Sequence, residues 1–126
     1  MPSPVSRLSA PLLAVLALAA TPGCREEPEK PYGQDAFSTD YAEAVCTLYQ
    51  QCEVMRVRAG YEDYQECADD VSAAAGGCAG FTSKQAIECV DAVNTLQCDD
   101  LFEGDWPEAC AEACSDDGAQ HGFSVE

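Results

Sequence analysis

The chain has few basic residues. Its 126 residues include 6 lysines and arginines against 23 aspartates and glutamates, which gives a formal net charge of −17. A surface this acidic repels nucleic acid and offers no cluster of cations that could hold phosphates. The composition therefore excludes nucleic-acid binding, and we expect any protein partner to be basic.

Long hydrophobic runs are also missing. The longest uncharged apolar run covers residues 8–20, whereas a helix that spans a bilayer needs about 20 apolar residues. A run of this length, preceded by a short segment whose one positive charge is Arg7, is typical of a signal peptide. We predict that residues 1–23 are such a signal peptide.

The sequence lacks the common motifs of catalysis and cofactor binding. It has no Cys-x-x-Cys pair, and its single histidine, His121, lies in a polar segment near the C-terminus. Thioredoxin-like chemistry requires the first motif, and an activated nucleophile commonly requires a neighbouring histidine. Gly76 and Gly77 end a predicted helix and do not form a phosphate-binding loop. We therefore predict a protein that is not an enzyme and has no cofactor.

Cysteine, in contrast, is abundant. Cys24 stands alone after the apolar run, and eight further cysteines follow, namely Cys46, Cys52, Cys67, Cys78, Cys89, Cys98, Cys110 and Cys114. Their spacings do not match a zinc site, so we expect them to form a disulfide framework in an exported protein. Ordinary secretion would leave nine cysteines and hence one unpaired thiol. Without Cys24 eight cysteines remain, an even number that allows all of them to form disulfides.

The residues Thr21-Pro22-Gly23-Cys24 resemble the lipobox of bacterial lipoproteins, although Thr21 stands where that family usually has leucine. The resemblance implies cleavage before Cys24, attachment of a diacylglycerol to that cysteine and anchoring of the chain to the membrane. Arg25, by the same likeness, implies sorting to the outer membrane. The alternative is ordinary cleavage near residues 17–19, which would release a soluble cysteine-rich protein.

Beyond the leader, the chain is predicted to have one folded domain. Residues 24–38 are charged and contain proline, so we expect the lipidated cysteine to be followed by a flexible tether. Residues 39–115 hold the eight cysteines and form the expected helical domain. Residues 116–126 are polar and contain glycine, and they are predicted to be a disordered tail.

Apolar residues in the domain recur at helical spacing. Helices are expected over residues 41–58, 61–75, 83–97 and 106–114, and no alternation of period two is long enough for a strand. The first helix has a predicted capping box of Asp40 and Glu43, and the third has one of Thr82 and Gln85. The fold class is therefore all-α, a small disulfide-stapled bundle of three to four short helices.

Eight cysteines allow 105 pairings, which geometry reduces. If the first two helices form a hairpin that turns at residues 59–60, Cys52 and Cys67 lie level and are expected to pair. Cys98 and Cys110 flank the next helix-to-helix loop and are also expected to pair. For the remaining four cysteines, Cys46–Cys89 with Cys78–Cys114 is one possible arrangement.

One acidic loop is a weak candidate for a calcium site. Asp99, Asp100, Glu103 and Asp105 cluster there, but their spacing does not fit an EF-hand, and calcium requires six to eight oxygen ligands. The alternative is a solvated loop whose carboxylates cap helices. The neighbouring Trp106, the only tryptophan, is either a binding anchor or a cover for the small core.

The whole chain resembles the small cysteine-rich lipoproteins of myxobacteria. The likeness rests on the leader, the tether rich in proline and glutamate, and the spacing Cys46-x5-Cys52-x14-Cys67. It implies no particular activity. Taken together, the sequence predicts a lipid-anchored, non-catalytic interaction module of the cell envelope, with weak cation binding as the alternative function.

Overall fold

The computed structural model describes residues 32–123. The predicted signal peptide, Cys24 and most of the predicted tether lie outside the described residues. The helices are α2 (Gln34–Gln51), α3 (Tyr64–Gly76), α4 (Ser83–Asn94), α5 (Cys98–Phe102) and α6 (Glu108–Ala113), followed by a 3-10 turn, η2 (Asp117–Ala119). Residues 32–123 contain no strand, so the all-α prediction is confirmed.

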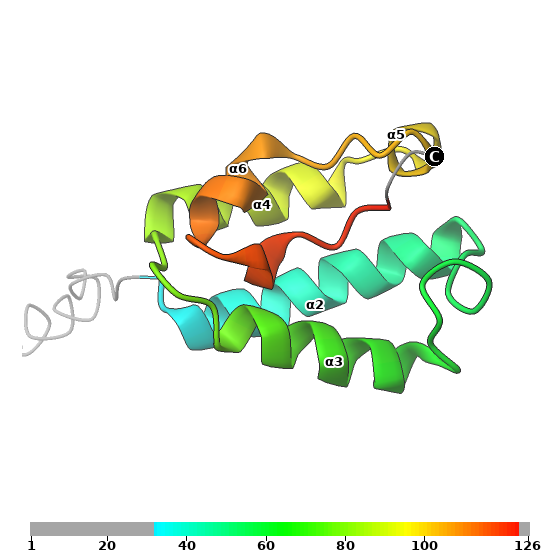
Figure 1. The fold of residues 1–126 in the computed structure, drawn as a ribbon, viewed down its shortest axis with the longest axis horizontal. Coiled ribbons are helices and arrows are strands. Elements are labelled where there is room, and N and C mark those ends of the chain that lie inside the picture. The colour runs from blue at the N-terminus through cyan, green and yellow to red at the C-terminus, as the bar shows by residue number, and fades with distance from the viewer. Residues whose placement is uncertain (1–31, 124–126) are drawn as a thin grey trace, which may run out of the picture. The chain divides into compact units, whose positions relative to one another are not determined.

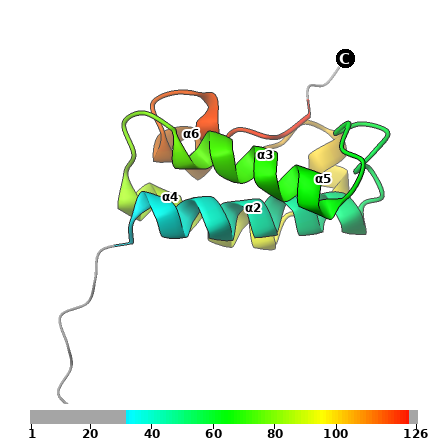
Figure 2. The same ribbon diagram turned by 90° about the horizontal axis from the view of Figure 1, so that it is seen from below.

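The helices form two halves (Figures 1 and 2). In the first, α2 and α3 lie side by side and run in opposite directions. In the second, the short helices α5 and α6 follow α4, and α4 packs on both α6 and α2. Residues 115–123, here called the C-terminal segment, run between the two halves and contact α3 and α6 through η2.

Helix α2 begins and ends seven residues earlier than predicted. Phe37 is fully buried and extends the apolar stripe of the helix by one turn towards the N-terminus, so residues 34–38 are helical and do not belong to a tether. Asp40 lies inside the helix and accepts a hydrogen bond from the Tyr32 hydroxyl at 2.7 Å, so the predicted cap at Asp40 is wrong. The helix ends at Gln51 with Cys52 as its C-cap, and Glu53 follows with φ of 56°.

The starts of the other helices follow local chemistry. Asp63 caps α3 by accepting a hydrogen bond from the backbone N–H of Glu66 at 2.9 Å. Thr82 precedes α4 as predicted, but its side chain makes no capping bond, so that capping box is wrong. Helix α6 begins after Pro107, whose side chain has no capping oxygen.

All eight cysteines of the domain are paired with one another. The disulfides are Cys46–Cys67, Cys52–Cys98, Cys78–Cys114 and Cys89–Cys110. One suggested pair, Cys78–Cys114, is therefore confirmed, and the expected pairs Cys52–Cys67, Cys98–Cys110 and Cys46–Cys89 are wrong.

The wrong pairs have a common cause in the positions of the helix ends. Because α2 stops at Gln51 and α3 starts at Tyr64, the connection between them is long, and Cys46 rather than Cys52 lies level with Cys67. Cys52 then sits at the end of α2 and bonds to Cys98, the first residue of α5, a helix that the sequence analysis did not predict.

Residues 116–123 of the C-terminal segment pack against the rest of the domain, so the disorder predicted for them is wrong. Ala119 is fully buried, and the Trp106 indole N–H donates a hydrogen bond to its carbonyl oxygen at 3.2 Å. The Phe123 ring stacks on Tyr49 with 5.4 Å between centroids. These contacts complete a core that the helices alone leave open.

The number of disulfides fits the compartment in which such bonds persist. Four disulfides in a domain this small indicate an exported or extracellular protein, because the cytosol keeps thiols reduced. None of the helices within residues 32–123 is both long enough and apolar enough to cross a membrane.

Candidate functional site

Three of the four predicted calcium-ligand candidates converge. The carboxylates of Asp100, Glu103 and Asp105 each place one oxygen within 4.8 Å of the others, whereas Asp99 does not join them. Asp100 lies in α5 and accepts a hydrogen bond from the backbone N–H of Gln97 at 3.2 Å, as part of a capping box. The loop therefore supplies three carboxylates, fewer than the six to eight oxygens that calcium takes.

Trp106 lies beside this acidic cluster. An open groove of about 410 Å³ runs along the cluster and past the indole ring. The indole N–H is already bonded to the Ala119 carbonyl oxygen, and a Cβ at Gly122 would come within 2.9 Å of the Trp106 side chain. These contacts make Trp106 the residue that holds the C-terminal segment against the second half, which fits the predicted role as a cover for the core.

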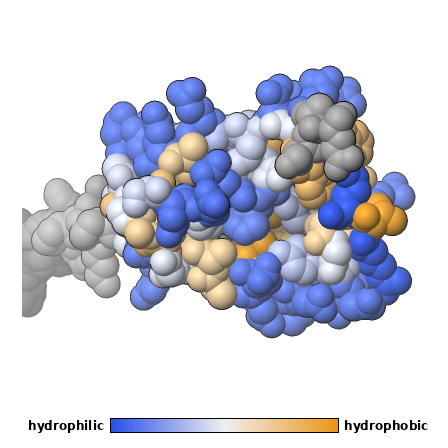
Figure 3. Space-filling model, viewed as in Figure 1, coloured by the Kyte–Doolittle hydropathy of each residue, from blue (hydrophilic) through white to orange (hydrophobic). Residues whose placement is uncertain are grey.

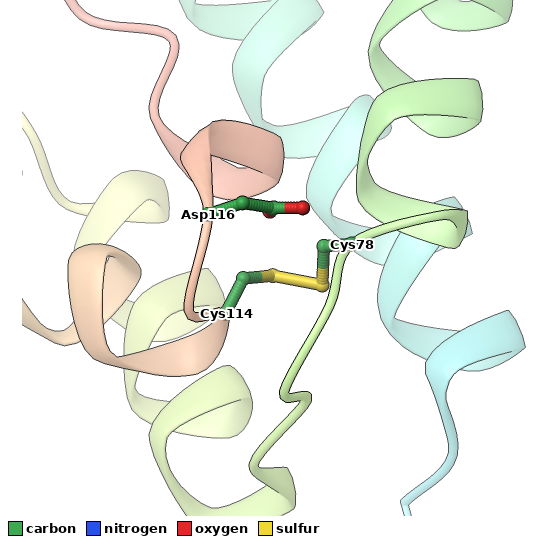
Figure 4. Close-up of side chains that lie close together, drawn as sticks. All are labelled: Cys78, Cys114 and Asp116. Atoms are coloured by element: carbon green, nitrogen blue, oxygen red, sulfur yellow. A yellow bond between two sulfur atoms is a disulfide. The ribbon is translucent and has the colours of Figure 1, made fainter.

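A second group of potential ligands combines Cys78, Cys114 and Asp116 (Figure 4). The two sulfur atoms are joined in a disulfide, so they do not act as thiolate ligands. Asp116 accepts hydrogen bonds from the backbone N–H groups of Gly118 at 2.9 Å and Ala79 at 3.0 Å. Bonds from these N–H groups lower the pKa of the Asp116 carboxyl. The group fastens the start of the C-terminal segment and is structural.

His121 is partly buried between the halves. Its Nδ1 lies 3.1 Å from the hydroxyl of the fully buried Tyr41, and its backbone carbonyl accepts a hydrogen bond from Tyr49. Burial lowers the pKa of the imidazole below its ordinary value, because desolvation disfavours the charged form. The sequence analysis placed this histidine in a disordered tail. Its partner is 80 residues away in the chain, and no local signal indicates the contact.

The most open apolar surface lies in the long connection between α2 and α3. Val57 is 78% exposed, more than any other large hydrophobic residue of the described chain. It borders an open groove of about 350 Å³, here called the loop groove, whose lining includes Glu53, Met55, Arg56, Val57, Glu62 and Asp63. This feature was not predicted, because residues 53–57 were assigned to a longer first helix and residues 62–63 to the second helix.

The loop groove carries more negative than positive charge. Arg56 is paired with Glu62 at 3.8 Å, and both side chains are exposed to solvent. Glu53 and Asp63 line the same groove and form no ion pair within the described residues. The nearby Arg58 is turned away onto aromatic rings, with its guanidinium carbon 4.6 Å from the Phe123 centroid. Two carboxylates without a salt bridge thus lie beside an exposed valine, and that of Asp63 also accepts the capping bond at the start of α3.

The loop that forms this groove is held in place. The Cys52–Cys98 disulfide fixes its start to α5. Within the loop, the backbone N–H groups of Arg58 and Tyr61 donate hydrogen bonds to the carbonyl oxygens of Val54 at 3.1 Å and Met55 at 2.9 Å. The groove is therefore a preorganised surface, which reduces the entropy that binding has to offset.

The chain was compared with protein-family models, curated proteins and solved structures, and no match was found in any of the three comparisons.

Proposed function

We propose that the protein is a lipid-anchored, non-catalytic interaction module of the bacterial cell envelope, held by a diacylglycerol on Cys24. The observation that carries the proposal is the complete pairing of the eight cysteines from Cys46 to Cys114. The framework has no need of Cys24, which follows a signal-like apolar run and a small residue. Attachment of a lipid would block the Cys24 thiol, which would otherwise stay unpaired in an oxidising compartment.

The acidic surface supports a basic protein as the partner. The chain has a formal net charge of −17, and no aspartate, glutamate, lysine or arginine side chain is buried within residues 32–123. The carboxylates are therefore on the surface, where they attract cations and repel nucleic acid. By the likeness to lipoproteins noted above, Arg25 favours the outer membrane as the location.

The anchor is tested by the mass and location of the native protein. We expect the protein isolated from membranes to begin at an acylated Cys24 and to gain eight hydrogens on reduction. A Cys24→Ser variant should lose the lipid and leave the membrane fraction. Recovery of the wild-type protein without lipid would contradict the anchor and favour the secreted, soluble alternative.

Weak cation binding is a second candidate function, because Asp100, Glu103 and Asp105 converge. Calorimetry with millimolar calcium chloride tests it. A Glu103→Gln/Asp105→Asn variant should lose the binding heat and leave the Asp100 cap intact. A variant with the same loss of charge elsewhere, Glu43→Gln/Asp91→Asn, should keep it. No binding heat for the wild-type protein would refute this function.

A further inference from the structure

We propose that the loop groove binds a segment of a partner protein in which a lysine or arginine neighbours an apolar side chain. This inference rests on the proposed function as an interaction module and assigns the partner class to one surface. The apolar side chain would cover Val57, and the cation would lie near Glu53 and Asp63.

Val57 exposes apolar area that a partner could cover. Val57 stands 78% exposed at a turn whose backbone is fixed by hydrogen bonds, so its side chain does not fold back onto the core. Burial of one valine side chain stabilises an interface by about 1.5 kcal/mol, which is about a tenfold gain in affinity. A partner with an apolar side chain gains this term, and a purely polar partner does not.

The charged residues of the loop groove are mostly acidic. Of the charged residues that line the groove, Glu53, Glu62 and Asp63 are acidic, and only Arg56 is basic. Since Arg56 already pairs with Glu62, the groove attracts a cation. An anionic segment would be repelled both by the groove and by the net charge of the whole chain.

Glu53 has a backbone conformation that is unusual for glutamate. Its φ of 56° lies in the left-handed region, where glycine is favoured after the end of a helix. Glutamate at this position forgoes stability that glycine would provide, and it places a carboxylate at the rim of the groove. A role in binding accounts for that cost.

The loop groove lies far from the start of α2. Helix α2 has 18 residues and is therefore about 27 Å long, and the loop groove lies at its C-terminal end. The first described residues, Tyr32 and Gly33, precede the other end of α2. In Figure 3 an apolar patch lies beside strongly hydrophilic side chains at the end of the molecule that holds the α2–α3 loop. The groove therefore lies at the end of α2 that is farthest from the first described residues.

The test uses the oxidised protein as purified from the producing cells and three fluorescent peptides. One alternates leucine with lysine, the second alternates serine with lysine, and the third alternates leucine with glutamate. Fluorescence anisotropy should show binding of the first peptide, at least tenfold weaker binding of the second and none of the third. Equal binding of the first two peptides would overturn the proposal, because charge alone would then suffice.

Variants locate the binding on the protein. Val57→Ser should weaken binding of the leucine–lysine peptide about tenfold, whereas Ile87→Ser, which alters an exposed apolar residue on α4, should leave it unchanged. Glu53→Gly should weaken binding about two- to fivefold, as expected for one exposed ion pair, and the melting temperature should rise. Loss of affinity without loss of stability rules out unfolding as the cause.

The control for charge is Glu43→Gln, which removes an exposed carboxylate from the middle of α2. It should leave the affinity unchanged. If Glu43→Gln weakens binding as much as Glu53→Gly, the acidic surface binds diffusely, and the loop groove is not the site. That result would leave the proposed interaction module standing, and the mass of the N-terminal peptide tests the anchor separately.

Discussion

The two halves of the domain differ in the lengths of their helices and in the side chains that they bury. The α2–α3 half has helices of 18 and 13 residues and buries the large aromatic side chains Phe37, Tyr41 and Tyr49. The second half has helices of 12, 5 and 6 residues. Apart from Val93 and Leu101, its buried apolar residues are alanines and cysteines, namely Ala86, Ala113, Cys89, Cys110 and Cys114.

The disulfides follow this division. Each half contains one internal disulfide with a sequence separation of 21, Cys46–Cys67 in the first and Cys89–Cys110 in the second. The other two, Cys52–Cys98 and Cys78–Cys114, join the halves. Short helices that bury little apolar surface are marginal on their own. The second half therefore depends on its covalent bonds more than the first half does.

Reduction of all four disulfides should have the largest effect. Each disulfide contributes about 2–4 kcal/mol, and the sum is comparable with the whole stability of a typical domain. We expect the protein to lose its helical circular dichroism and its cooperative thermal transition in excess reductant. A reduced protein that still melts cooperatively would show that the α2–α3 half can sustain the fold alone.

Removal of one internal disulfide at a time should separate the halves. The chain-entropy contribution is about 3 kcal/mol for either bond, because both close loops of the same length. We expect Cys89→Ala/Cys110→Ala to cost more than Cys46→Ala/Cys67→Ala, since the second half has few other contacts. Amide hydrogen exchange should then speed up in α4 and α6, while α2 stays protected.

Equal losses in the two double variants, measured by denaturant unfolding, would contradict this difference between the halves. Loss of protection in α2 when Cys89 and Cys110 are removed would contradict it as well.

The contact of His121 with the first half should make stability depend on pH. Burial lowers the pKa of His121 in the folded state, so the unfolded state binds the proton more readily. The stability that neutral His121 contributes is present above about pH 6.5 and is lost as the pH falls towards the folded-state pKa. Tyr41, which contacts the ring, and Tyr49, which bonds to the His121 backbone, stay neutral in this range because burial raises the pKa of each. The charge of Asp70 partly opposes the shift of the His121 pKa.

Thermal unfolding between pH 7 and pH 5 tests this dependence. Wild-type protein should lose stability relative to His121→Gln, which does not titrate and can still bond to Tyr41. Parallel curves for the two proteins would show that His121 does not control the attachment of the C-terminal segment.

The smallest expected difference lies in the helix caps. The Asp63 carboxylate accepts a capping hydrogen bond at the start of α3, whereas the Thr82 side chain makes none at the start of α4. Asp63→Ala should therefore cost about 1 kcal/mol, and Thr82→Ala should cost only a few tenths. Denaturant midpoints measure both, and a Thr82→Ala loss as large as that of Asp63→Ala would contradict the assigned caps.

Some of these features were predictable from the sequence, and others were not. The apolar stripe of α2 and the even cysteine count indicated a disulfide-stapled helical domain, because period and parity are local or numerical signals. The pairing of Cys52 with Cys98 was not predictable, since it depends on where α2 stops. That end depends on Glu53, which adopts a backbone conformation that glycine usually takes.

The candidate site divides in the same way. The convergence of Asp100, Glu103 and Asp105 follows from their closeness in the chain, so the sequence indicated it. The loop groove was not predicted, because the apolar spacing through Met55 continued the helical pattern past the actual end of α2. The place of His121 depends on packing against residues far away in the chain, which composition does not encode.

The order of the disulfides along the chain has a consequence for survival among proteases. The loop closed by Cys52–Cys98 overlaps the loop closed by Cys46–Cys67 on one side and the loop closed by Cys78–Cys114 on the other. Every peptide bond between Cys46 and Cys114 is therefore enclosed by at least one disulfide. A single cut anywhere in that stretch releases no fragment, and the nicked protein stays in one piece until it is reduced.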